Sequence, residues 1–164
     1  MRSAAASLVI AATTLSVAFA GGEPTDAELR AIFEQHRAGL EQLRLMFEED
    51  RRRYQLRLVY AQPDEWDRAR SRCDGRTVNC IPAARWEDYA SRLRKVGVEH
   101  IETHETPGVY FHVHRTLPPR WSGPYRYRGL VYAPGFPKVV HDHDDTEARV
   151  DLGGGWFSYL IIDD

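Results

Sequence analysis

The chain has 164 residues, of which 43% are hydrophobic and 11% aromatic, a size and composition that suit one domain with one buried core. Its 24 acidic residues and 22 Lys or Arg residues give a formal net charge of −2 at pH 7. A chain this close to neutrality lacks the basic field of a nucleic-acid-binding protein, so we expect no nucleic-acid partner.

Residues 1–20 have the pattern of a secretory signal peptide. Arg2 supplies a short basic start, and the apolar run that follows ends in Ala18-Phe19-Ala20, the small-x-small pattern that export peptidases cut. The run is too short for a helix that remains in the bilayer, so we expect cleavage before Gly21 and no stable membrane span afterwards. Residues 21–164 are then expected to form a single domain that is periplasmic or secreted.

A long first helix is predicted to begin at Thr25. Thr25 and Glu28 have the spacing of a capping box, in which each residue satisfies a backbone N–H of the other. From Leu29 onward, apolar residues recur every three or four positions, which predicts an amphipathic helix reaching about Asp50. Gly39 lies inside this helix and indicates either a bend or a close packing contact.

A strand is predicted from Tyr54 to Tyr60, where large apolar residues alternate with polar ones. Cys73 and Cys80 follow, separated by a short polar spacer. In an exported chain this pair predicts one disulfide bond. The alternative of a redox pair is disfavoured because such cysteines are spaced Cys-x-x-Cys, and a metal site would need two further ligands close by.

A second helix is predicted from about Pro82 to Val96, with proline in its first turn and Gly97 just past its end. After it the hydrophobic period changes to two, which predicts a series of short strands. These strands are Val98–Ile101, Val109–Arg115, Gly129–Tyr132, Lys138–Val140 and Trp156–Ile162. The order of elements predicts an α+β fold, in which an antiparallel β-sheet packs against the long N-terminal helix and a second shorter helix.

Six of the seven histidines lie between His100 and His143. A period of two would place His112 and His114 on one face of a strand, where two imidazoles can share zinc or another transition metal. The competing interpretation is that this face points to water and that His141 and His143 lie in a polar turn. We therefore expect no cofactor as the first hypothesis. The alternative is a metal site formed by His112, His114, His141 and His143.

A segment bounded by proline and glycine, 118–128, interleaves arginine with Trp and Tyr. These residue types dominate the hot spots of binding interfaces, because they bury a large area and keep a polar or charged end. The competing interpretation is a packed surface loop that leads into the next strand. The candidate contact residues are Arg120, Trp121, Tyr125 and Arg126.

Familiar catalytic motifs are missing from the sequence. It contains no Gly-x-Ser-x-Gly elbow, no glycine-rich phosphate loop and no His-Glu-x-x-His. Pairs of carboxylates or a Ser-His-Asp set can be chosen only by picking residues freely. We therefore assign no catalytic residues and expect a protein that is not an enzyme.

Several blocks of the sequence together resemble a loose group of small, uncharacterised exported proteins of proteobacteria. The blocks are Phe33–Asp50, Trp86–Ile101, Tyr110–Val113, Arg128–Tyr132 and Gly155–Tyr159. The resemblance covers most of the chain after the leader. It implies an α+β domain that ends in an aromatic strand, it implies no catalytic residues, and its pattern does not include the histidines.

These observations predict an exported, non-enzymatic domain that binds another macromolecule in the periplasm or cell envelope. The partner would be a protein or an envelope component, and an inhibitor or immunity-type protein is the most concrete version. The second hypothesis is a periplasmic metal-binding protein that uses the clustered histidines. The third is a structural component of the envelope.

Overall fold

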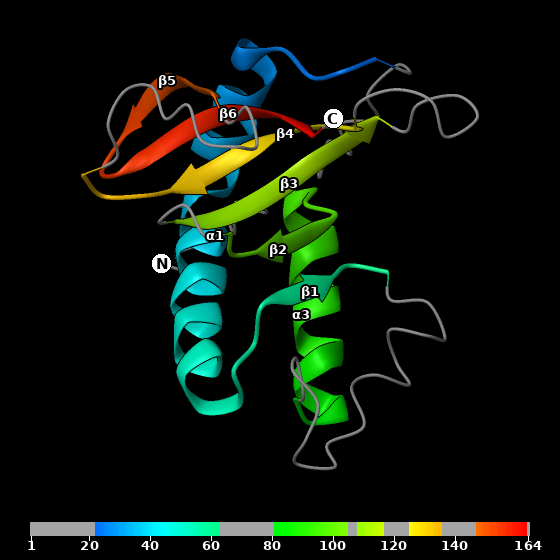
Figure 1. Cartoon of the computed structure of the whole chain (residues 1–164). Helices are drawn as coiled ribbons and strands as arrows, with labels where there is room; N and C mark the ends of the chain where they lie inside the picture. Colours follow the sequence, from blue (N-terminus) through cyan, green and yellow to red (C-terminus); the bar gives the residue numbers. More distant parts are fainter. Residues whose placement is uncertain (1–21, 63–80, 105–107, 117–124, 136–146, 164) are drawn as a thin grey trace, which may run out of the picture.

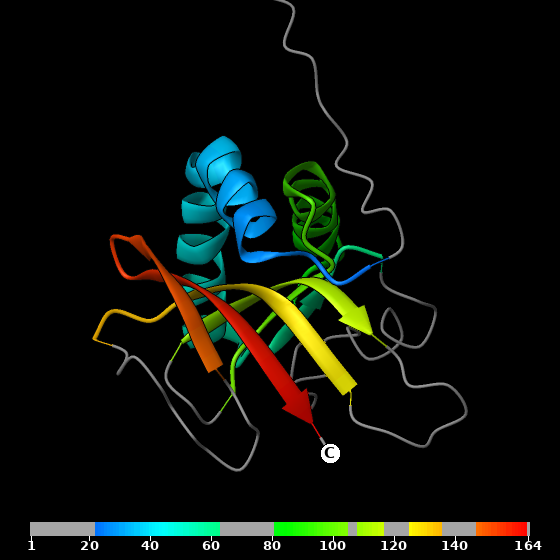
Figure 2. The ribbon, with the colours of Figure 1, turned by 90° about the horizontal axis from the view of Figure 1, so that it is seen from above.

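In the described part of the chain, two helices lie on one face of a six-stranded antiparallel sheet (Figures 1 and 2). The order of strands across the sheet is β1-β2-β3-β4-β6-β5. This arrangement confirms the predicted α+β fold with its long N-terminal helix. The computed structural model describes residues 22–62, 81–104, 108–116, 125–135 and 147–163. The predicted leader, the two cysteines and the predicted strand Lys138–Val140 lie outside these residues.

Helix α1 (Asp26–Tyr54) begins with the predicted capping box, in which the backbone N–H of Glu28 donates to the hydroxyl of Thr25. The helix ends at Tyr54, later than the predicted Asp50. Its last turn holds Arg51–Arg53, and arginine both favours helix and complements the negative end of the helix dipole. The strand predicted from Tyr54 is consequently shorter, and β1 is limited to Leu58–Tyr60.

Helix α3 (Ala83–Val96) lies beside α1 and covers the other part of the same face of the sheet (Figure 2). Pro82 occupies the N-cap position, one residue before the predicted first turn, and makes no side-chain capping hydrogen bond. Gly97 closes the end of the helix with a φ of 72°, a left-handed conformation that glycine adopts without strain. A methyl group at Gly39 of α1 would lie 3.0 Å from Cγ1 of Val96. Gly39 therefore marks a close packing contact between the helices, one of the two roles expected for it.

The remaining strands follow α3 in antiparallel succession. They are β2 (His100–Glu102), β3 (Val109–Thr116), β4 (Tyr125–Tyr132), β5 (Glu147–Gly153) and β6 (Trp156–Asp163). Strand β4 starts before the predicted Gly129, because it pairs with β3 on one side and β6 on the other along its whole length. Strand β5 was not predicted, although Ala148, Val150 and Leu152 alternate with charged residues there.

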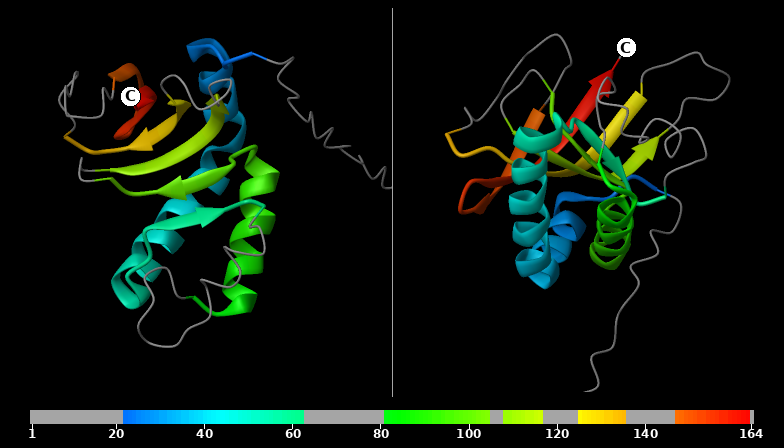
Figure 3. Two further views of the ribbon diagram at one scale, coloured as in Figure 1. Left: turned by 45° about the vertical axis from the view of Figure 1, so that its right-hand side comes forward. Right: turned by 90° about the horizontal axis from the view of Figure 1, so that it is seen from below.

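The sheet buries both of its faces, and the two faces have different compositions. The face toward the helices carries the main core, in which Phe33 and Phe47 of α1 pack with Trp156 and other apolar side chains. The face away from the helices carries a smaller aromatic cluster. The two views of Figure 3 show this face of the sheet on the side opposite α1 and α3. Its buried members are Tyr110, Val131, Ala133, Tyr159 and Ile161. None of the described helices is long and apolar enough to cross a membrane.

Candidate metal centre

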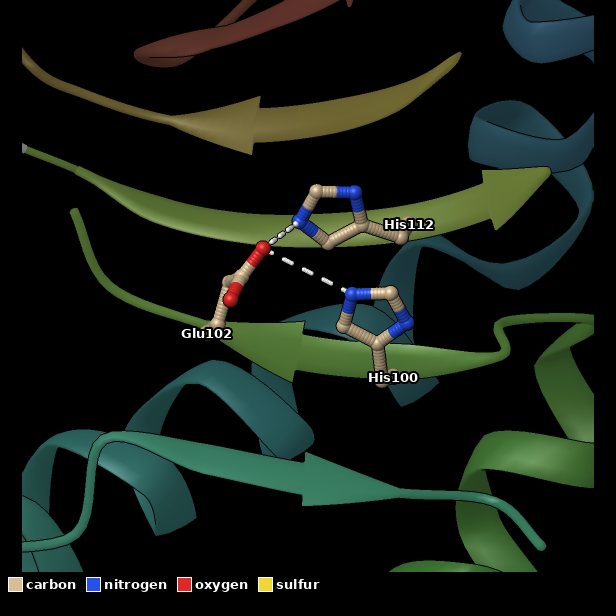
Figure 4. A group of neighbouring side chains, drawn as sticks. All are labelled: His100, Glu102 and His112. Atoms are coloured by element: carbon tan, nitrogen blue, oxygen red, sulfur yellow. Dashed lines mark ion pairs between the residues drawn. The ribbon is translucent and has the colours of Figure 1, made fainter. Parts of the chain in front are cut away.

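Three imidazole rings surround one carboxylate on the face of the sheet away from the helices. Atom Oε1 of Glu102 lies 2.6 Å from Nε2 of His112, 3.1 Å from Nε2 of His104 and 3.5 Å from Nε2 of His100. The rings of His100 and His112 stack with their centroids 4.0 Å apart. One ligand atom each from His100, Glu102 and His112 lies within 4.8 Å of the others, and Figure 4 shows the three side chains converging.

The pairing of β2 with β3 builds this cluster. The period of a strand places His100 and Glu102 on the same face, and His104 follows with the same two-residue spacing. The antiparallel register sets His100 directly opposite His112 and Glu102 opposite Tyr110. Side chains opposite each other in such a pair lie close enough to contact, which explains the stacked rings.

Tyr159 of β6 reaches the cluster across an intervening strand. Gly129 of β4 pairs with His112 on one side and with Tyr159 on the other. Because Gly129 has no side chain, the phenol of Tyr159 extends over β4, and its hydroxyl lies 2.7 Å from Nδ1 of His112. A methyl group at Gly129 would lie 3.0 Å from that hydroxyl and would collide with the carbonyl oxygen of Phe111. Glycine is therefore required at this position.

The centre of the cluster is buried and its edge is partly open, with the side chains of Glu102 and His104 21% and 27% exposed. The side chain of His112 is 0% exposed and that of His100 is 7% exposed. Nε2 of His112 lies 2.6 Å from Oε1 of Glu102, so these two possible ligand atoms face each other inside the cluster. Burying charged and polar groups costs free energy unless they are paired, and a bound ion is one way to pair them.

The environment sets the charge of each group near neutral pH. Burial alone would raise the pKa of Glu102, but its contacts with three histidines outweigh burial and hold that pKa below its ordinary value. Burial, helped by the neighbouring His100, lowers the pKa of His112 to about 3 despite the attraction of Glu102. Burial also raises the pKa of the Tyr159 phenol well above its ordinary value. The carboxylate is therefore ionised while His112 and Tyr159 are neutral.

Neutral imidazoles and an ionised carboxylate are the forms in which these side chains bind metals. Donation of the Nδ1 hydrogen of His112 to the hydroxyl of Tyr159 would leave a lone pair on Nε2, which faces Glu102. Tyr159, His112 and Glu102 also resemble a proton relay, in which a carboxylate and a histidine activate a hydroxyl group for catalysis. Tyr159 is 0% exposed, however, so no substrate can reach its oxygen in this structure. Metal ligation is the chemistry that suits a cluster of imidazoles around a carboxylate.

A scan against protein-family models, a search of curated proteins and a search of solved structures find no match to this chain. The resemblance to small exported proteins of proteobacteria therefore stays a prediction. Function has to be inferred from the geometry of the chain itself.

One of the four predicted metal ligands, His112, belongs to this cluster. The pairing of β3 with β4 shifts register between His112 and His114, which is a β-bulge that breaks the period of two. His114 pairs with Arg128, whose guanidinium contacts Asp26 at the start of α1, so His114 faces the helices while His112 faces away from them. The prediction that the two histidines share a face is wrong. His141 and His143 lie outside the described residues.

The predicted contact residues lie partly in a strand. Tyr125 and Arg126 are the first residues of β4, which corrects their placement in a loop. The guanidinium of Arg115 lies 5.1 Å from the ring of Tyr125, and Nε of Arg126 lies 3.3 Å from a carboxylate oxygen of Glu23. Arg120 and Trp121 lie outside the described residues. Use of these four residues by a macromolecular partner stays a prediction.

Three members of the cluster were missed at the level of sequence, namely His100, Glu102 and His104. They form the pattern His-x-Glu-x-His, and on an extended chain that pattern places all three on one face. The predicted strand ended at Ile101, one residue before the carboxylate, so the pattern was interrupted. Nothing in the sequence pointed to Tyr159, because its contact depends on the order of β3, β4 and β6.

Proposed function

We propose that this protein binds a transition-metal ion, with zinc as the best fit, through His100, Glu102 and His112. The observation that carries the proposal is the convergence of one possible ligand atom each from His100, Glu102 and His112 within 4.8 Å of one another, around the fully buried ring of His112. Among the residues that the structure describes, this is the one group of three His, Cys, Asp or Glu side chains whose possible ligand atoms lie this close together.

The donor set favours zinc. Imidazole nitrogen and carboxylate oxygen are both common zinc ligands, and two histidines with one glutamate leave the fourth tetrahedral position for water or another ligand. Tyr159 and His104 complete the surroundings. The hydroxyl of Tyr159 is placed to hold the ring of His112, and His104 contacts the carboxylate of Glu102, as outer groups do around metal ligands.

We also propose that the protein is exported, which rests on the basic start, apolar run and small-x-small pattern of residues 1–20. Zinc binding needs no macromolecular partner, and it does not conflict with the partner expected from the sequence. That partner stays a prediction, because half of its candidate residues lie outside the part of the chain that the structure describes.

Zinc stoichiometry and affinity test the metal site. The protein would be purified without a histidine tag, stripped with a chelator and titrated with zinc against a chromophoric competitor. We expect one zinc per chain. His100→Gln and Glu102→Gln should each weaken binding by at least about tenfold, because each removes a ligand from a site of three.

His114→Gln is the matched control, because His114 lies in the same strand as His112 but on the opposite face of the sheet. Its zinc affinity should equal that of the unmodified protein, and circular dichroism would verify that every variant is folded. Substoichiometric zinc in the unmodified protein, or equal affinity in folded Glu102→Gln, would contradict the proposal.

A further inference from the structure

We propose a second ligand site, a cavity beside the proposed metal site, which binds a small organic carboxylate. The cavity has a volume of about 490 Å³ and is lined by residues of β1, β2, β3 and the end of α3, among them Tyr60, Arg94, His100 and Arg115. A volume of this size suits a ligand rather than a single water molecule. Binding of a carboxylate in the cavity does not depend on the metal site, whereas coupling between the two sites rests on the function proposed above.

Two guanidinium groups give the cavity its charge. Arg94 donates to the backbone carbonyl of Ala61 at 2.7 Å, and the guanidinium of Arg115 lies 5.6 Å from the ring centroid of Tyr127. Neither arginine is within ion-pair distance of a carboxylate among the described residues. Both are thus held in place with donors left over, and guanidinium donors match the geometry of a carboxylate.

Glu99 also lines the cavity and supplies the opposing charge. Two arginines against one glutamate leave a net positive charge within the described lining. An anion with a single negative charge would neutralise it. This balance favours a monocarboxylate over a neutral molecule or a multiply charged anion.

His100 belongs both to the lining of the cavity and to the proposed metal site. Its Nε2 faces Glu102, and Figure 4 shows its second ring nitrogen directed away from that carboxylate. An imidazole that ligates a metal through Nε2 keeps its hydrogen on Nδ1, where a carboxylate in the cavity would accept it. The ring of Tyr60 lies 5.2 Å from that of His100 and provides an aromatic wall. These features favour an aromatic or similarly flat carboxylate.

Coupling between the two sites follows from this shared residue. A carboxylate that accepts the Nδ1 hydrogen makes the ring of His100 a better metal ligand, as carboxylates do beside many zinc sites. Such coupling is reciprocal, because any ligand that raises the affinity for zinc has its own affinity raised by the same factor.

Benzoate and its neutral analogue benzamide test the cavity in the metal-free protein by calorimetric titration. We expect benzoate to bind and benzamide to bind at least about tenfold more weakly, since only benzoate pairs with the guanidinium groups. Arg94→Gln and Arg115→Gln should each weaken benzoate binding by about tenfold. Arg92→Gln is the matched control, because Arg92 already pairs with Asp88 at 2.7 Å and lies outside the cavity lining.

Equal binding of benzoate and benzamide, no binding of benzoate, or unchanged binding in both cavity variants would overturn the carboxylate site. A second titration in saturating zinc tests the coupling, with a gain in benzoate affinity of about fivefold expected in the unmodified protein and none in His100→Gln. Benzoate binding without zinc binding would support the cavity and remove the proposed metal function. Zinc binding without benzoate binding would do the reverse.

Discussion

At the scale of single residues, Gly129 decides whether the cluster can form. It lies between His112 and Tyr159 in the register of the sheet, and its missing side chain opens the path between them. A strand interior disfavours glycine, because glycine loses more backbone entropy on folding and offers nothing to pack. Its presence here is explained by the close approach of the Phe111 carbonyl and the Tyr159 hydroxyl.

Gly129→Ala should therefore lower the free energy of unfolding by about 3 kcal/mol, because a methyl group there forces β3 and β4 apart. It should also weaken zinc binding, because Tyr159 would lose its position beside His112. Urea unfolding and zinc titration of the same samples measure both effects.

Gly39→Ala serves as the control. Its methyl group would meet one side-chain carbon of Val96 at 3.0 Å rather than backbone, and the gain in helix propensity offsets part of the crowding, so the change should stay within about 1 kcal/mol. Equal losses in the two variants would contradict this account.

At the scale of elements, a buried aspartate joins the two helices. Oδ2 of Asp50 in α1 lies 2.7 Å from Nε of Arg85 and 2.9 Å from the hydroxyl of Tyr89, both in α3. Asp50 is 3% exposed and Tyr89 is 0% exposed. Burial and the nearby Asp50 carboxylate raise the pKa of the Tyr89 phenol above its ordinary value, so the phenol stays a hydrogen-bond donor. The pair of helices is thus tied by polar contacts as well as by apolar packing.

Asp50→Ala should lower the free energy of unfolding by about 3 kcal/mol, because it leaves the buried phenol of Tyr89 and part of Arg85 without an acceptor. Asp88→Ala is the matched control on α3. It removes a more exposed carboxylate that pairs with Arg92 along the helix surface, and such pairs contribute less than about 1 kcal/mol. Chemical denaturation at neutral pH measures both variants. A loss of under 1 kcal/mol for Asp50→Ala would show that apolar packing alone holds the helices together.

At the scale of the whole molecule, the two faces of the sheet have separate roles. The face toward α1 and α3 holds most of the apolar core, and the opposite face holds the histidine cluster beside a smaller aromatic group. The extended core on one face supplies the rigidity that a preorganised site on the other face needs.

Export is the prediction that concerns the whole chain. We expect the protein isolated from its cell envelope or medium to begin at Gly21 and to carry Cys73 and Cys80 as a disulfide, because export exposes the pair to oxidising conditions. Intact mass spectrometry before and after reduction measures both features. A chain that retains Met1, or that reacts with a thiol reagent before reduction, would contradict the prediction. A Cys73→Ser variant controls for the mass change on reduction.

Local patterns were enough to predict much of the fold. The capping box at Thr25, the helical period that follows it and the glycine after Val96 depend on residues within a few positions of one another, and the structure confirms each of them. The change to a period of two likewise predicted β3 and β6 nearly in full. Strand β5 was missed, because charged residues hid its alternation.

The site depended on contacts between strands, which no local pattern records. Spacing along the chain was enough to show that histidines gather in its second half and that His112 lies in a strand. The meeting of His112 with His100 and Glu102 rather than with His114 follows from the folded sheet alone. Register and a β-bulge, not spacing along the chain, select which side chains share a face. The reach of Tyr159 across Gly129 was decided there too, since it needs three strands in a particular order.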